Sequence, residues 1–177
     1  MSEQLIISVS REYGSGGHEI AQKLAEYYKL PMYDHNLLDE VAASMNVSSK
    51  ELAEFDEKRR NKFLYRSVMG MNSSPADNVA RMQFDYIKKK AEAGESFVIV
   101  GRCSEIVLKD NPNLISIFVL GDREAKIERV MQIYELDARH AEERMSEKDR
   151  RRKSYHNSNR EAKWGESRNS ELYTNSS

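Results

Sequence analysis

The sequence contains little cysteine and no long hydrophobic run. Cys103 is its single cysteine, so no disulfide can form within the chain, as expected in a reducing compartment. The apolar runs, such as Leu5 to Val9 and Phe97 to Val100, have the length of strands and fall far short of the ~20 residues that a membrane helix needs. The residues before Leu5 contain no basic and apolar leader. We therefore expect a cytoplasmic protein with no membrane partner.

A large excess of one charge is also absent. The formal net charge of −1 over 177 residues argues against strong global attraction to nucleic acid, so we expect no nucleic-acid partner. We expect no metal site in the protein itself, because His35, His140 and His156 lack the spacing of zinc ligands. The chain does have 39% hydrophobic and 32% charged residues, which is typical of a helix-rich single domain with a solvated exterior.

Three apolar runs predict the central strands of a sheet. They span Leu5 to Val9, Ser96 to Val100 and Leu114 to Leu120, and they are rich in Ile and Val, as strands buried on both faces are. A helical pattern follows each run, which predicts an α/β fold with a parallel sheet and helices on both faces. Shorter strands are expected at Pro31 to Asp34 and at Glu171 to Thr174.

Two charged stretches outside these strands have helical spacing. Between Asp34 and Ser96, apolar residues recur at helical intervals on either side of a loop-forming segment at 70–75. This insertion predicts a substrate-binding lobe, although helices that merely cover the sheet would give the same pattern. After Asp137, basic residues, including Arg150 to Lys153, alternate with acidic ones. Such a mixture is typical of a solvated helix or a nucleic-acid patch, and it suits a helix that closes cations over a small polyanion.

The glycine-rich segment Gly14 to Gly17 lies between the first strand and a helical pattern. Free amide groups and the positive end of the helix dipole make such a turn a binding site for phosphate. The customary motif has Lys and then Ser or Thr after its last glycine, whereas Gly17 to Glu19 occupy that region here. Arg11 and His18 are the nearest candidates to supply the missing positive charge. A plain strand-to-helix turn is the alternative.

An arginine follows the strand that ends at Val100. Strand ends in a parallel sheet form the crevice where ligands bind, and Arg102 stands there behind Gly101. Its guanidinium can bind phosphate through two hydrogen bonds, and a surface salt bridge is the alternative.

The order of these features resembles the cytidylate kinase-like family of nucleoside monophosphate (NMP) kinases. The matching segments, in family order, are ISVSREYGSGGHEIAQKLAE, PMYDHNLL, FVIVGRCSEIVL, ISIFVLGDREAKIERV, EKDRRRKSYHN and KWGESRNSELYTNSS. This resemblance implies a three-layer P-loop kinase fold in a single domain, residues 1–177. It divides the chain into a core (about 1–34, 94–136 and 171–177), a helical NMP-binding insertion (about 35–93) and an arginine-rich lid (about 137–170).

The resemblance also implies the reaction and the residues that take part in it. The expected reaction passes the γ-phosphate of ATP, with Mg²⁺, to a pyrimidine monophosphate such as CMP or dCMP. The residues expected to hold the donor phosphates are Arg11, Gly14, Ser15, Gly16, Gly17, His18 and Glu19. Those expected at the acceptor are Tyr33, Asp34 and Arg102. The expected catalytic residues are Arg11 and the lid residues Lys148, Arg151 and Arg152, oriented by Asp149.

Two alternatives to this function follow from the missing lysine and the weakly matched insertion. One is a kinase of another small acceptor, and the other is a nucleotide-binding sensor without turnover. The resemblance further leads us to expect a helix beyond Ser177 that packs on the sheet. Without that helix a flank of the sheet would be open, which would favour a homo-oligomer.

Overall fold

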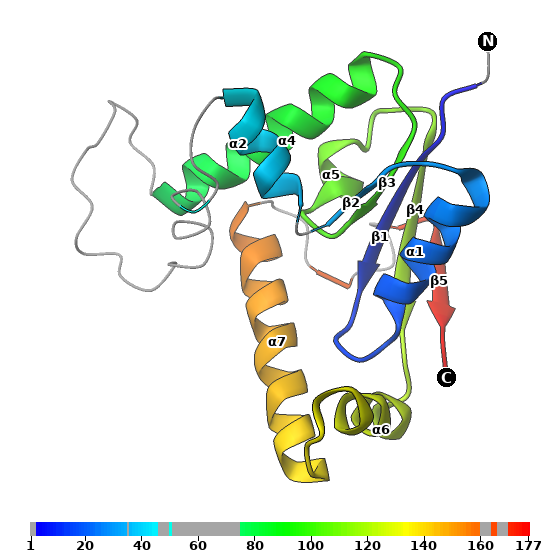
Figure 1. The fold of residues 1–177 in the computed structure, drawn as a ribbon, viewed down its shortest axis with the longest axis vertical. Coiled ribbons are helices and arrows are strands. Elements are labelled where there is room, and N and C mark those ends of the chain that lie inside the picture. The colour runs from blue at the N-terminus through cyan, green and yellow to red at the C-terminus, as the bar shows by residue number, and fades with distance from the viewer. Residues whose placement is uncertain (1–2, 35, 46–49, 51–74, 160–163, 166–169) are drawn as a thin grey trace.

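A single parallel sheet forms the centre of the computed structural model. The model describes residues 3–34, 36–45, 50, 75–159, 164–165 and 170–177. The strands are β1 (Ile6–Arg11), β2 (Met32–Tyr33), β3 (Phe97–Val100), β4 (Leu114–Leu120) and β5 (Leu172–Asn175). They lie in the order β2-β3-β1-β4-β5, and every neighbouring pair is parallel (Figure 1). The predicted parallel α/β sheet is therefore confirmed.

One strand boundary matters for function. The sequence predicts that β1 ends at Val9, so that Arg11 follows the strand, but the strand continues through Arg11. The extension occurs because Ser10 and Arg11 still pair with Phe118 and Val119 of β4. Arg11 is therefore held by the sheet and does not belong to the loop.

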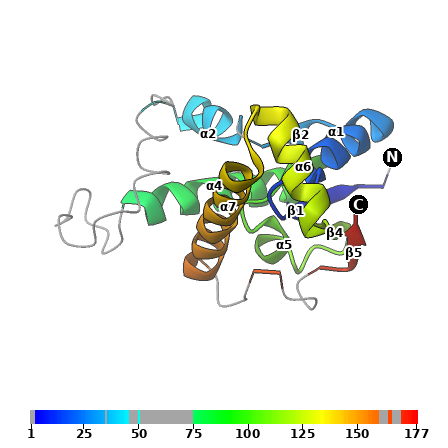
Figure 2. The same ribbon diagram turned by 90° about the horizontal axis from the view of Figure 1, so that it is seen from below.

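Helices cover both faces of this sheet. They are α1 (Gly17–Tyr28), α2 (Leu37–Met45), α4 (Pro75–Glu92), α5 (Ser104–Val107), α6 (Arg123–Tyr134) and α7 (Ala138–Asn159). Figure 2 shows α1 and α5 on opposite sides of the strands, with α6 and α7 across one end of the sheet. Of the predicted loop at 70–75, residues 70–74 lie outside the described residues, and Pro75 begins α4. None of the helices in the described ranges is both long and apolar enough to span a membrane.

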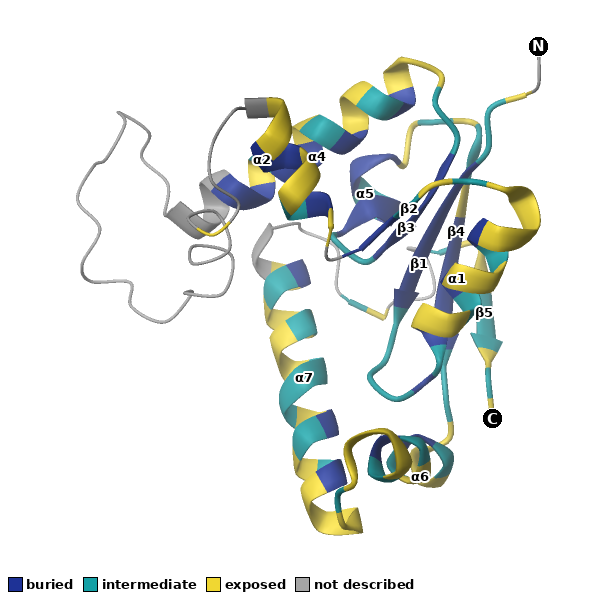
Figure 3. Ribbon diagram, viewed as in Figure 1, coloured by how far each residue is buried: buried dark blue, intermediate teal, exposed yellow. Residues whose placement is uncertain are grey.

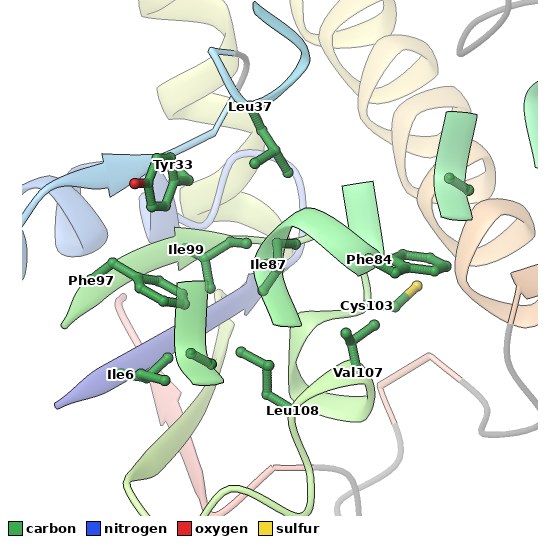
Figure 4. Close-up of a cluster of buried hydrophobic side chains, with 12 residues drawn as sticks. Ile6, Tyr33, Leu37, Phe84, Ile87, Phe97, Ile99, Cys103, Val107 and Leu108 are labelled. Carbon is green, nitrogen blue, oxygen red and sulfur yellow. The ribbon is translucent and has the colours of Figure 1, made fainter. Parts of the chain in front are cut away.

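The core consists of separate clusters on the two sheet faces. On one face, Phe97 and Ile99 pack with Phe84 and Ile87 of α4 (Figure 4). On the other face, side chains of β1, β3 and β4 pack against the small residues of α1. Strands β1, β3 and β4 are buried along most of their length, whereas α7 is buried at only a few positions (Figure 3). These two clusters fix the positions of the strand ends, where the sequence predicts the functional residues.

Aromatic side chains cover part of the flank formed by β4 and β5. The ring of Phe118 lies 5.5 Å from that of Trp164 and 5.2 Å from that of Tyr173. Within the described residues this flank is therefore not bare, and the expected homo-oligomer stays a prediction.

Candidate active site

The loop between β1 and α1 presents backbone amides rather than side chains. Gly14 and Gly16 have φ angles of 81° and 72°, which glycine adopts without strain. Gly16 caps α1 and offers no side-chain hydrogen bond, so the first amides of α1 are not capped by it. The Ser15 hydroxyl donates to the carbonyl of Glu12 at 2.9 Å, which closes the loop on itself. This geometry suits an anion at the head of α1.

Arg11 fills the space that a side chain at position 17 would need. A Cβ on Gly17 would lie 2.5 Å from Cβ and 2.9 Å from Cγ of Arg11, and such contacts do not occur in proteins. A Cβ on Gly101, at the end of β3, would lie 2.6 Å from Nη1 of Arg11. The Arg11 side chain therefore passes over the start of α1 and its guanidinium reaches β3.

This arrangement is the customary motif with two positions exchanged. In G-x-x-x-x-G-K-[ST] the first position is glycine and the seventh is lysine. In this chain the first of those positions is Arg11 and the seventh is Gly17. The long cationic side chain comes from the strand, and the glycine that makes room for it comes from the helix.

Asp34 lies beside this cation at the end of β2. Its carboxylate is 3.7 Å from Nη2 of Arg11 and 3.0 Å from Nδ1 of His18. The side chain of Asp34 is 9% exposed and that of His18 is 50% exposed. The structure thus brings together three predicted residues, one acidic and two nitrogen-bearing, in front of α1.

Helix α7 reaches the same place through Arg152 and Asp149. Nη1 of Arg152 donates to the carbonyl of Arg11 at 3.1 Å, and its guanidinium lies 5.3 Å from the ring centre of Tyr13. Oδ1 of Asp149 accepts from the amide of Tyr13 at 2.7 Å. Oδ1 of Asp149 also lies 3.7 Å from Nη1 of Arg152, and the orienting role of Asp149 stays a prediction.

Burial and neighbouring charges shift the pKa values of the charged residues in this site. Burial and the positive charge of Arg152 lower the pKa of Arg11 to about 10, against the opposing effect of Asp34. Burial also lowers the pKa of Arg152 and raises that of Asp149. Both arginines still carry their charge near neutral pH, at an electrostatic cost that an anion beside them would relieve.

Sequence reasoning missed two cations on α6. Nζ of Lys126 donates to Glu12 at 2.7 Å, and Nη1 of Arg129 donates to the carbonyl of Gly14 at 2.6 Å. They lie three residues apart on one helical face, directly after a strand that pairs with β1. That spacing was the available signal, since helices after neighbouring parallel strands meet at one edge of the sheet.

A left-handed turn places Arg102 close to Arg11. Gly101, Arg102 and Cys103 have φ angles of 74°, 61° and 54°, which is costly for the two that are not glycine. The charge of Arg102 contributes to the lowered pKa of Arg11, and its guanidinium lies 5.9 Å from the ring centre of Tyr155. Arg102 therefore stands at the rim of the cationic site.

Other predicted residues lie farther from this centre. Tyr33 is a core residue whose ring is 5.5 Å from that of Phe97. Arg151 pairs with Glu147, and its side chain is 58% exposed. Lys148 is partly exposed on α7, and Glu19 is exposed in the first turn of α1, where a negative charge favours the helix dipole.

The family follows from the whole chain. The sequence model of the cytidylate kinase-like family matches residues 6–177. The chain belongs to the cytidylate kinase-like family. The crystal structure of an uncharacterized protein from Eubacterium ventriosum is 42% identical, with a TM-score of 0.76 over 97% of this chain and 88% of that chain. The predicted family and its kinase class are thereby confirmed.

A more distant structure supports the fold of this cytidylate kinase-like chain. Shikimate kinase from Bacteroides thetaiotaomicron has a TM-score of 0.54 at 10% identity, over 97% of this chain and 86% of that chain. At this identity the similarity shows a P-loop kinase fold alone. No curated protein matches the chain significantly.

Proposed function

We propose that the protein transfers the γ-phosphoryl group of ATP to a pyrimidine nucleoside monophosphate, CMP or dCMP. Membership of the cytidylate kinase-like family supports this reaction. The observation that carries it is the position of Arg11, whose side chain lies over Gly17 at the head of α1. A P-loop kinase needs a cation there for the outer phosphates, and Arg11 supplies it in place of lysine.

The loop fits the donor phosphates. The amides of Gly17, His18 and Glu19 begin α1, and the bare Gly14 and Gly16 let the backbone approach an anion closely. The described ranges hold no group of three acidic, His or Cys residues that could bind a metal ion. Magnesium would therefore enter with ATP, held mainly by its phosphates, and would neutralise charge there.

The acceptor would sit between β2, β3 and α7. Arg102, Arg11 and Arg152 give this region more positive than negative charge, with Asp34 the buried carboxylate among them. A phosphate acceptor is already ionised near neutral pH, so positioning and electrostatics suffice for the transfer. Arg152 would bridge the transferring group, and Asp149 would hold Arg152 in place.

The division of the chain follows the same proposal. Residues 35–93 would bind the monophosphate and residues 137–170 would form the lid, around a core of 1–34, 94–136 and 171–177. Much of the insertion, residues 51–74, lies outside the described residues. A cytoplasmic location and a homo-oligomer stay predictions.

The test is a phosphoryl-transfer assay. We expect the protein with CMP, ATP and Mg²⁺ to give CDP and ADP, separated by ion-exchange chromatography. Arg152→Ala should lower kcat about 10³-fold, because arginines that stabilise a transferring phosphoryl group contribute at least this much. Arg139→Ala, which removes an 84% exposed side chain paired with Glu143 on the same helix, is the matched control and should stay active. No transfer to any nucleoside monophosphate would reject the proposal.

A second candidate is a kinase of a small hydroxyl compound. Asp34 favours it, because a buried carboxylate beside the phosphate loop can accept the proton of an attacking hydroxyl, which a phosphate acceptor does not need. A panel of nucleotides and polyols separates the two kinases. Tight ATP binding in calorimetry without turnover on any acceptor would instead indicate the nucleotide sensor.

A further inference from the structure

Helix α7 is attached to β1 at two points. The first is the bond from Arg152 to the carbonyl of Arg11. At the second, Nε2 of His156 hydrogen-bonds to Oε1 of Glu105 at 2.8 Å, and the Ser10 hydroxyl donates to Oε2 of the same carboxylate at 3.1 Å. Glu105, on α5, therefore links β1 to α7.

The two attachments lie next to each other in both elements. Ser10 and Arg11 are consecutive residues of β1, and Arg152 and His156 are one turn apart on α7, about 6 Å along its axis. Asp149 also attaches α7 to the amide of Tyr13, and a further attachment at His156 restricts the rotation and the register of the helix at this end. The network therefore fixes where Arg152 stands relative to Arg11.

The residues of this second attachment are buried. The side chains of Glu105 and His156 are 4% and 5% exposed, and Ser10 is buried as well. Nδ1 of His156 has no hydrogen-bond partner among the described residues, so the ring is oriented by Glu105 through Nε2 alone. Where its burial is described, the rest of α7 is exposed or partly exposed, apart from Ala141 and Met145 near its opposite end.

A buried pair of this kind is poorly explained by stability. Apolar residues of similar size in its place often leave a protein equally stable or more stable. Polar groups retained in a core can instead specify one arrangement over its neighbours, as in coiled coils. Three hydrogen-bonded residues that end beside Arg11 and Arg152 suit that second role.

We propose that Ser10, Glu105 and His156 are positioning residues that set the register of α7 and thereby hold Arg152 at the transferring phosphoryl group. This inference rests on the proposed kinase function. None of the three need touch a substrate, because they act through Arg152 and through the strand that carries Arg11.

A double-mutant cycle tests the proposal. Glu105→Leu/His156→Leu removes the pair and leaves one small polar group, the Ser10 hydroxyl, without its partner, so the fold should survive, as checked by circular dichroism and thermal unfolding. We expect kcat to fall roughly 10²-fold, the typical cost of misplacing a catalytic group by about 1 Å, with little change in KM. In the Arg152→Ala background the same pair should cause no further loss. Glu105→Gln preserves the shape and an acceptor oxygen, and it should stay close to wild type.

Other outcomes separate this inference from the proposed function. An equal loss of kcat with and without Arg152, or no loss in the folded Leu/Leu variant, would overturn the positioning role. Glu142→Leu is the matched control, because it breaks the exposed contact of α7 with Arg123 and should leave kcat unchanged. If the wild-type protein transfers no phosphoryl group, the proposed function fails. A crystal structure of the Leu/Leu variant then still tests the inference, since an unshifted α7 with Arg152 still bonded to the carbonyl of Arg11 would contradict it.

Discussion

The two faces of β1 are built from different chemistry. On the α1 face, Ile7 and Val9 lie in an apolar cluster and are followed by Arg11. On the α5 face, Ile6 is followed by Ser8, which hydrogen-bonds to Ser104 at 2.7 Å, and by Ser10, which bonds to Glu105. Alternate residues of one strand thus meet hydrocarbon on one side and polar groups on the other.

The difference shows how one strand serves two tasks. Apolar burial on the α1 face stabilises the strand strongly but has no preferred direction. It therefore holds β1 in place, and β1 carries the Arg11 side chain that lies over Gly17. Hydrogen bonds on the α5 face are weaker in net energy but directional, so they can orient a distant helix. The support and the alignment of the site therefore depend on different substitutions.

The largest expected effect comes from the α1 face, at Gly17. In Gly17→Lys the new side chain would collide with Cβ and Cγ of Arg11, so we expect kcat to fall about 10³-fold. Arg11→Gly should lose a similar amount, because the cation is gone. The double variant Arg11→Gly/Gly17→Lys recreates the customary order of glycine and lysine, and it should recover most of the lost activity in the CMP assay.

Gly94→Lys is the control for that experiment. A Cβ on Gly94, unlike one on Gly17, meets no atom within 4 Å, so lysine there should leave kcat unchanged. A double variant no more active than either single variant would contradict the exchange of positions 11 and 17. So would a fully active Gly17→Lys.

A smaller effect is expected on the free energy of unfolding, which should fall by different amounts for substitutions on the two faces of β1. Ile7→Ala removes a buried side chain from the apolar face and should lower the free energy of unfolding by about 3 kcal/mol. Ser8→Ala, one residue away on the other face, removes one hydrogen bond and should cost about 1 kcal/mol. Urea unfolding with a common m-value measures both. Equal losses at the two positions would mean that the faces do not differ in this way.

The fold was predictable from local pattern, whereas the centre of the site was not. Runs of Ile and Val predict the central strands, and β4 lies where the sequence predicts it, at Leu114–Leu120. The hydrophobic signal of these runs is repeated at most of their positions. The end of β1 depends instead on pairing with β4, which no local pattern shows. For that reason the sequence does not predict that the Arg11 side chain lies over Gly17.

Polar contacts between residues far apart in the sequence were also not predictable. His156 has no spacing that marks it in the sequence, and its partner Glu105 is 51 residues away. Cys103 is 2% exposed, because the left-handed turn at Gly101 directs it into the core. Both results depend on the backbone conformation after β3, and non-glycine residues in that conformation are not predictable from composition.

The smallest expected effect is on thermal stability. It concerns an exposed pair, His140 and Asp137, which can be compared with the buried pair of His156 and Glu105. At the start of α7, Nδ1 of His140 lies 2.7 Å from the carboxylate of Asp137. Hydrogen bonding to Asp137 raises the pKa of His140, and hydrogen bonds from His140 lower the pKa of Asp137. The histidine therefore contributes stability that is complete below its ordinary pKa of about 6.5 and is lost as the pH rises through the higher folded value.

Asp137 contributes stability at pH values above its ordinary pKa. This contribution is lost as the pH falls through the lower pKa that Asp137 has in the folded protein. His140→Ala should consequently lower the Tm more at pH 5.5 than at pH 8.5, by a small amount that 1 M salt reduces, since both side chains are exposed. Thermal unfolding at the two pH values measures the difference. A larger loss at pH 8.5 would mean that the pair has the opposite sign. An effect on kcat would mean that this exposed end of α7, and not the buried end at His156, sets the position of Arg152.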